Sequence, residues 1–298
     1  MKRRLAAILG FGVLGVSVGL LAGIASTQAP PSTDIYLADL DLSTSPPSLG
    51  NLHNLTQREG YDNQPFFEPE GIGLLYTSAR ENQTDIYRID LTSLTATQLT
   101  ETPDSEYSPT VMPAGLELSV IRVEDDGTQR LWAFRRDGSA PRVLLQDVAP
   151  VGYHAWGQGE QVLLYVLGEP ATLQLADLGI GSAEIVATDI GRSLHRVPGR
   201  DGFSFIQQSD AGNRIRFLAG SGVISDLGPT LADSQDMTWT PDGRIVMASG
   251  TRIYIRHPEG NWQLIADLVR PEIVAVTRLA VNAAGDKLAL VALRPTSD

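Results

Sequence analysis

One turn pattern recurs through the chain at nearly constant spacing, and this repeat constrains the fold more than any other feature. It is plainest in FFEPEGIGLLYT, TVMPAGLELSVI, TWTPDGRIVMAS and AVNAAGDKLALV, where glycine follows an apolar residue by four positions. In three of them proline stands two residues before the glycine and presets φ for a turn. Glycine accepts the left-handed conformation that closes a hairpin. Each copy therefore predicts a β-hairpin.

Two looser copies, AWGQGEQVLLYV and RVPGRDGFSFIQ, fill the gap in this series. The apolar anchors are then spaced by 44, 45, 41, 42 and 42 residues, at Phe67, Val111, Trp156, Val197, Trp239 and Val281. Between hairpins lie two further strand signals, such as DIYRIDL and then TATQLT. Alternation of apolar and polar residues in several of them is typical of a strand with two unlike faces. Each repeat is thus predicted to be a four-stranded antiparallel meander.

Four strands in every 40 to 45 residues are typical of one blade of a β-propeller. The chain starts with a strand pair, residues 34–56, that lacks the first two strands of a repeat, and ends with a hairpin, residues 276–293, that lacks the last two. Together they complete one blade and cover sheet edges that would otherwise be exposed. The prediction is an all-β, six-bladed propeller over residues 34–298, closed by a blade that both ends share. A barrel or a sandwich does not explain the constant period.

The N-terminal segment, residues 1–25, predicts export. Lys2, Arg3 and Arg4 precede Leu5–Ala25, in which Ser17 is the only polar residue. This apolar run is longer than the usual signal-peptide core and is close to the length that spans a bilayer, so a cleaved signal peptide and a membrane anchor both remain open. Residues 26–33 form a linker. The propeller is predicted to lie in the periplasm or cell envelope, or to be secreted, with membrane contact only through an uncleaved segment.

Charge and composition exclude several classes of protein. The net charge is −12 and no Lys/Arg cluster follows the first four residues, which excludes nucleic-acid binding. The chain has no cysteine and therefore no disulfide, thiolate metal site or cysteine nucleophile. Gly15–Gly19 matches a nucleophile-elbow pattern, but inside the export segment, where the match is accidental. No catalytic residue, metal site or cofactor is predicted, which favours a binding protein over an enzyme without deciding the question.

Several stretches, among them QPFFEPEG, LLYTS, TDIYRIDL, TQLT and MTWTPDGRIVMAS, resemble the WD40-like repeats of TolB-type six-bladed propellers. In that family a P-x-W-S-P-D-G hairpin, an I-Y strand and a terminal L-T recur. The resemblance covers about residues 34–293 and implies the propeller architecture. TolB itself carries an α/β domain before its propeller and works with cell-envelope Tol proteins and a peptidoglycan-associated lipoprotein. Here only the linker separates the export segment from the first blade.

A binding site is predicted where the loops that lead into the innermost strands surround the mouth of the central channel. Mixed charges and aromatic rings there suit a polar peptide or a sugar. The residues expected at this mouth are Tyr61, Asp62, Asn63, Gln64, Glu106, Tyr107, Tyr153, His154, Arg192, His195, Arg196, Asp236 and Arg278. An alternative assigns the same side chains to hydrogen bonds between blades. His154 and His195 occupy equivalent positions in successive strands, either as hydrogen-bonded core imidazoles or as metal ligands or an acid/base pair.

The sequence leaves two classes of function open. The first is an exported, monomeric binding module that holds a protein, peptide or glycan on one face of the propeller. The alternative is a hydrolase or lyase that acts on a sugar or lactone at the channel mouth, because propellers host both kinds of site and the fold alone does not decide.

Overall fold

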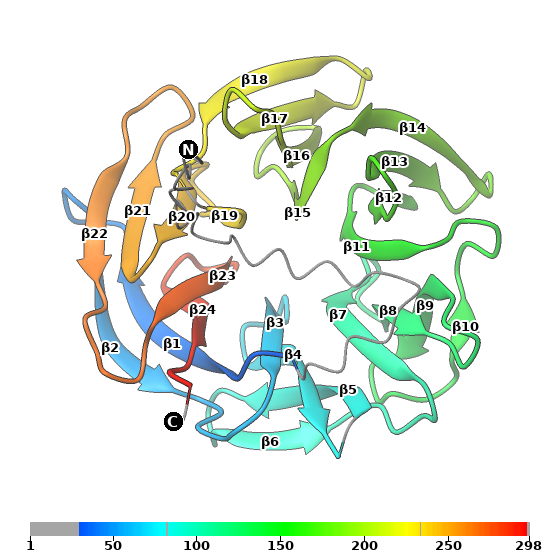
Figure 1. Ribbon diagram of the computed structural model, residues 1–298, viewed down its shortest axis with the longest axis horizontal. Coiled ribbons are helices and arrows are strands. Elements are labelled where there is room, and N and C mark those ends of the chain that lie inside the picture. Colours follow the sequence, from blue (N-terminus) through cyan, green and yellow to red (C-terminus); the bar gives the residue numbers. More distant parts are fainter. Residues whose placement is uncertain (1–29, 82, 233, 297–298) are drawn as a thin grey trace, which may run out of the picture.

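The computed structural model describes residues 30–81, 83–232 and 234–296, which form a ring of six four-stranded antiparallel sheets (Figure 1). The predicted six-bladed propeller is confirmed. The export segment and residues 26–29 of the linker lie outside the described residues. No helix among the described residues has both the length and the apolar character needed to cross a membrane.

Five blades each use four consecutive strands, ordered from the channel to the rim. Blade 2 consists of β3 (Asp62–Phe67), β4 (Gly73–Arg80), β5 (Gln83–Asp90) and β6 (Thr95–Gln98). Blade 3 consists of β7 (Ser105–Val111), β8 (Glu117–Val123), β9 (Gln129–Arg135) and β10 (Arg142–Val143). Blade 4 consists of β11 (Val151–Trp156), β12 (Gln161–Val166), β13 (Thr172–Asp177) and β14 (Ser182–Thr188).

Blades 5 and 6 follow in the same manner. Blade 5 consists of β15 (Ile190–Arg196), β16 (Gly202–Gln207), β17 (Arg214–Ala219) and β18 (Ile224–Pro229). Blade 6 consists of β19 (Met237–Trp239), β20 (Ile245–Ser249), β21 (Arg252–Arg256) and β22 (Gln263–Asp267).

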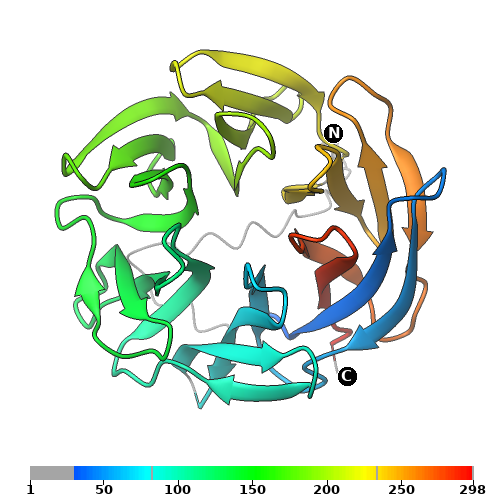
Figure 2. The same cartoon turned by 180° about the vertical axis from the view of Figure 1, so that it is seen from behind.

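Blade 1 joins the two ends of the described chain, as Figure 2 shows from behind. Its inner strands are β23 (Ala275–Val281) and β24 (Lys287–Leu293), and its outer strands are β1 (Thr33–Asp41) and β2 (Ser48–Asn54). β1 pairs with β24 over seven residues, from Thr33 opposite Leu293 to Asp39 opposite Lys287. The shared blade predicted from the sequence is therefore present, and hydrogen bonds between strands close the ring.

The core lies between the blades rather than inside any one of them. The second strand of each blade is covered on both faces by neighbouring blades, so its side chains are buried without alternation. In β24, all five side chains from Leu288 to Ala292 are fully buried. This explains why these strands read as continuous apolar runs in the sequence.

Blade 3 departs from the predicted pattern at its rim. The sequence RVLLQD suggests a full outer strand, whereas β10 has only two residues. The reason is that the chain then turns inward and buries Leu145 against Val151 and Val162 in the core between blades 3 and 4. Burial of Leu145 takes the place of further pairing between β10 and β9.

Tryptophan indoles tie neighbouring blades together at two equivalent places. Trp156 Nε1 donates to Ser119 Oγ at 2.8 Å, from blade 4 to blade 3. Trp239 Nε1 donates to Ser204 Oγ at 2.8 Å, from blade 6 to blade 5. Both tryptophans are repeat anchors, so the anchor position serves packing and hydrogen bonding at once.

We expect Trp239→Phe to lower the free energy of unfolding by about 1–3 kcal/mol, because the buried Ser204 hydroxyl loses its donor. Urea denaturation monitored by circular dichroism measures this change. Trp262→Phe is the matched control, since Trp262 Nε1 has no hydrogen-bond acceptor among the described residues. Equal losses in the two variants would show that the Trp239–Ser204 bond contributes nothing specific.

Candidate functional site

Six of the predicted residues gather around the channel, one from each blade. We call the end where loops lead into the inner strands the channel mouth. The residues precede or lie within β3, β7, β11, β15, β19 and β23, and we refer to them as the channel cluster: Tyr61, Tyr107, Tyr153, Arg192, Asp236 and Arg278. All six are half-buried. The sequence-based expectation that these positions converge therefore agrees with where the structure places them.

Two hydrogen bonds span the channel. Arg278 Nη2 donates to the Tyr153 hydroxyl at 3.0 Å, which links blade 1 to blade 4 on the opposite side of the ring (Figure 1). Arg192 Nη2 donates to the Thr277 carbonyl at 3.0 Å, which links blade 5 to blade 1. The Arg278 guanidinium also lies 5.0 Å from the centre of the Tyr153 ring, within range of a cation–π interaction. The mouth is thus narrow and lined by cations and phenols.

Asp236 is the carboxylate of the channel cluster. Its Oδ1 accepts a hydrogen bond from Leu279 N at 3.0 Å, and its Oδ2 lies 3.7 Å from Arg278 Nη1. Burial raises the pKa of Asp236, and it also raises the pKa of Tyr61. The pKa of Arg192 is lowered, first by the positive charge of Arg278 and then by burial. The cluster therefore holds two guanidiniums close enough to repel each other.

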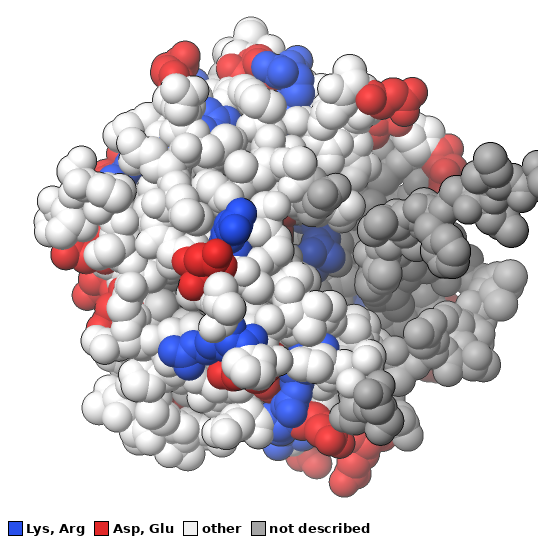
Figure 3. Space-filling model, turned by 60° about the vertical axis from the view of Figure 1, so that its left-hand side comes forward, with Lys and Arg blue, Asp and Glu red and all other residues white. Residues whose placement is uncertain are grey.

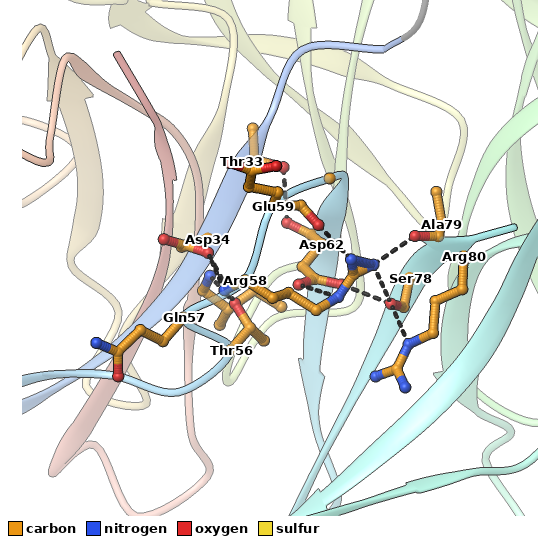
Figure 4. A network of polar contacts seen from close by, with 12 residues as sticks. Thr33, Asp34, Thr56, Gln57, Arg58, Glu59, Asp62, Ser78, Ala79 and Arg80 are labelled. Carbon is orange, nitrogen blue, oxygen red and sulfur yellow. Dashed lines mark hydrogen bonds and ion pairs between the residues drawn. The ribbon is translucent and has the colours of Figure 1, made fainter. Parts of the chain in front are cut away.

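Asp62 belongs to a network that joins blade 1 to blade 2 (Figure 4). Its carboxylate lies 3.1 Å from Arg58 Nε and accepts a hydrogen bond from Ser78 Oγ at 2.6 Å. Its carbonyl accepts a hydrogen bond from Thr33 Oγ1 at 2.9 Å. Asp62 is fully buried, and burial raises its pKa. It is thus turned into the seam where the chain closes and away from the channel cluster.

Asn63 and Gln64 shape the inner strand of blade 2. β3 has an irregularity between Asn63 and Phe66, and Gln64 takes a positive φ of 56°. Asn63 Oδ1 accepts from Gln64 N at 2.8 Å, while Gln64 Oε1 accepts from Thr77 Oγ1 at 2.6 Å and from Ser108 N at 2.8 Å. Both amide side chains are therefore used in contacts within and between blades.

Glu106 is fully buried at the seam between blades 2 and 3. Its Oε1 accepts a hydrogen bond from Thr102 Oγ1, and Arg122 Nε lies 3.7 Å away. Burial raises its pKa to about 7, and the neighbouring carboxylate of Asp85 adds to this rise. Glu106 therefore forms part of an acidic pair with Asp85 and is not open to a ligand.

Of the two histidines, His154 is buried within the ring and His195 is half-buried. His154 Nε2 shares hydrogen bonds with the Ser119 hydroxyl at 2.7 Å and with the Thr110 hydroxyl. His195 Nε2 lies 3.1 Å from Ser193 Oγ. Burial lowers the pKa of His154 to about 3 and that of His195 to about 4, so both imidazoles are neutral at pH 7.

Arg196 lies away from the rest of the predicted site, so its placement at the channel mouth is wrong. It is the last residue of β15, is exposed, and borders a hollow next to Val197 and Pro198 at the hairpin end of blade 5. The reason is that Arg196 ends β15, at the opposite end of the strand from the mouth, whereas Arg192 lies near its start and reaches the cluster. A larger groove of about 810 Å³ lies at the same end, between blades 3 and 4.

Several residues take part in these contacts without having been predicted from the sequence. Arg58 stands three residues before Tyr61 in the same loop, so its loop position was an available signal. Asp85 is the third residue of β5, and Tyr165 packs edge-on against Tyr153 with 5.7 Å between ring centres. No sequence signal distinguishes these two from other strand residues.

The described residues contain no group of three or more His, Cys, Asp or Glu side chains placed to hold a metal ion. Figure 3 shows Lys and Arg lying near Asp and Glu on the side turned to the viewer, with uncharged surface between these groups. What distinguishes the channel cluster chemically is a pair of guanidiniums with phenols, suited to hold an anionic or polar group.

No protein-family model matches the chain, and no curated protein matches it in sequence. Solved structures do match it in fold. A protein from Agrobacterium tumefaciens assigned to TolB superposes with a TM-score of 0.73 at 13% identity, covering 90% of this chain and all of that one. TolB from Acinetobacter baumannii gives a TM-score of 0.58 at 13% identity, over 88% of this chain and 64% of that one.

An enzyme shares the same fold. An oligogalacturonate lyase in complex with manganese superposes with a TM-score of 0.58 at 14% identity, over 82% of this chain and 80% of that one. The structural neighbours thus include TolB-like six-bladed propellers, as the repeat pattern predicted, and also a lyase. At these identities the similarity concerns the fold.

Proposed function

We propose that this chain is an exported β-propeller that binds a protein, peptide or glycan at the channel mouth. The observation that supports this most is the channel cluster itself. Buried charges cost free energy, and apolar side chains of similar volume would fill the channel as stably or more stably. Groups with perturbed pKa values concentrate at functional sites. A cluster that places two arginines, an aspartate and three tyrosines at one mouth is therefore better suited to recognition than to closure of the ring.

The location belongs to the same proposal. The basic residues and apolar run of residues 1–25 are those of an export signal or anchor, which would place the propeller in the periplasm or cell envelope. A binding module in that compartment, working as a monomer, accords with the resemblance to TolB-type repeats.

A second candidate is a lyase that acts on a sugar or lactone, and one observation favours it. Burial alone raises the pKa of Tyr153, but Arg278 and Arg192 outweigh this effect and lower it. A phenol with a lowered pKa is suited to act as a general base. Turnover of oligogalacturonate or of a lactone panel by the wild-type protein, lost in Tyr153→Phe, would support the lyase over the binding module.

We expect Tyr107→Ala, Arg192→Ala and Arg278→Ala each to weaken capture of the partner by about tenfold or more, which corresponds to about 1.4 kcal/mol. The measurement compares tagged variants as bait in the native envelope fraction, followed by titration of the protein or glycan that is recovered. Melting temperatures are recorded for every variant. Arg196→Ala is the matched control, because Arg196 is exposed at the opposite end of its strand.

Full capture by all three mouth variants would refute the proposed site. The same conclusion would follow if Arg196→Ala reduced capture as much as they do. Loss of capture counts only for variants that keep the melting temperature of the wild-type protein.

A further inference from the structure

The channel cluster holds more positive than negative charge. Arg192 and Arg278 are both cationic, and the carboxylate that acts on both is that of Asp236. Its Oδ2 lies 3.7 Å from Arg278 Nη1, while its Oδ1 is used by Leu279 N. One carboxylate therefore faces two guanidiniums in a place where the Arg278 side chain is only 11% exposed. An uncompensated charge at such low exposure is costly unless an anion joins it.

Arg192 has hydrogen-bonding capacity left over. One of its terminal nitrogens donates to the Thr277 carbonyl. Its Nε is buried and has no acceptor among the described residues. A guanidinium offers five N–H donors in a fork that matches a carboxylate in geometry. A carboxylate placed beside Arg192 would accept a hydrogen bond from this Nε and would also balance the second positive charge.

The shape of the mouth selects among anions. The bonds from Arg278 to Tyr153 and from Arg192 to Thr277 both span the channel. A slender group at the end of a flexible arm can pass between them, whereas a sugar ring is wider and carries hydroxyls that need partners of their own. An acidic side chain or a chain-terminal carboxylate of a peptide fits this geometry best.

We infer that the ligand of the channel mouth is an acidic peptide whose carboxylate binds between Arg192 and Arg278. This rests on the proposed function and narrows it from any protein, peptide or glycan to one chemical class. The neighbouring tyrosines, Tyr61, Tyr107 and Tyr153, supply ring surface for the apolar part of the peptide arm.

Tyr153 provides an independent readout. Burial raises the pKa of its hydroxyl, yet the two guanidiniums outweigh burial and lower it, because their positive charge stabilises the phenolate form relative to the phenol. A bound carboxylate would remove that stabilisation and raise the pKa of Tyr153 again. The titratable and charged groups that act on this hydroxyl are Arg278, Arg192, Asp236, Tyr61 and Tyr165, while Tyr107 acts on Tyr61 and Arg278 acts on His195.

The test uses the whole protein with three synthetic probes: the capped tripeptide acetyl-Ala-Asp-Ala-amide, its Asn counterpart, and digalacturonate. Calorimetric titration measures affinity, and ultraviolet difference absorbance of tyrosinate measures the pKa of Tyr153, with Tyr153→Phe identifying the signal. We expect the Asp peptide to bind about tenfold or more tightly than the Asn peptide and to raise the pKa of Tyr153. Arg192→Gln should remove this preference while its amide keeps a donor for Thr277.

Equal binding of the Asp and Asn peptides, or an Asp preference that persists in Arg192→Gln, would overturn the inference. Tighter binding of digalacturonate than of the Asp peptide would overturn the assignment to a peptide. These failures are distinct from failure of the proposed function, because that function is judged by partner capture with the mouth variants and the Arg196→Ala control, not by the synthetic probes.

Discussion

Removal of residues 276–298 is expected to abolish the cooperative fold. The deletion takes away nearly all of β23 and all of β24, and with them five fully buried side chains from Leu288 to Ala292. β1 loses its partner along seven residues and presents an unpaired edge, while the neighbouring blades present uncovered apolar faces. The shortened protein should show no sharp thermal transition by circular dichroism and should elute as aggregates in size-exclusion chromatography.

Deletion of residues 295–298 is the matched control, because it leaves β24 complete. This variant should keep the melting temperature of the full chain. A soluble protein lacking residues 276–298 that melts as sharply and at the same temperature as the full chain would contradict closure of the ring through blade 1.

Glu106→Gln is expected to stabilise the protein at alkaline pH. Burial raises the pKa of Glu106 from 4.5 in its ordinary state to about 7 in the folded protein. The folded state therefore prefers the protonated acid. The stability that Glu106 contributes is fully present below its ordinary pKa and is lost as pH rises through 7. The loss corresponds to about 3 kcal/mol, at about 1.4 kcal/mol for each unit of pKa. Glutamine resembles the protonated acid and does not ionise.

Urea denaturation at pH 4 and pH 8 measures this effect as a difference between variant and wild type. The free energy of unfolding of Glu106→Gln, relative to that of the wild type, should increase by about 3 kcal/mol from pH 4 to pH 8. Glu81→Gln, at an exposed position, should show no such growth. A constant difference between Glu106→Gln and wild type across this range would mean that Glu106 is ionised without cost in the fold.

The architecture could be predicted from the sequence because each blade repeats one local signal. The Pro-Gly hairpins and the alternating strands depend on neighbouring residues, and the count of their repeats gives the number of blades. The incomplete repeats at the two ends also predicted which strands would share blade 1. What escaped prediction is the short β10, since its cause is the burial of Leu145 by a neighbouring blade.

The site was predictable in position but not in detail. The rule that residues ahead of each anchor converge brought Tyr153, Arg192 and Arg278 together correctly. It could not show that the Arg278–Tyr153 bond joins residues 125 positions apart, because only the closed ring brings blades 1 and 4 face to face. It also failed for Arg196, because this residue ends β15 and so lies a full strand length from the mouth.

Site-specific photo-crosslinking tests most directly whether the channel mouth is the binding surface. A photoreactive amino acid, p-benzoylphenylalanine, replaces Glu59, which is exposed in the loop leading to β3, or Arg196, which is exposed at the opposite end. Each protein is irradiated in the cell fraction that contains it, and adducts are identified by mass spectrometry. We expect one adduct from position 59 and none from position 196. An adduct from position 196 alone would place the partner on the other face and contradict the proposed site.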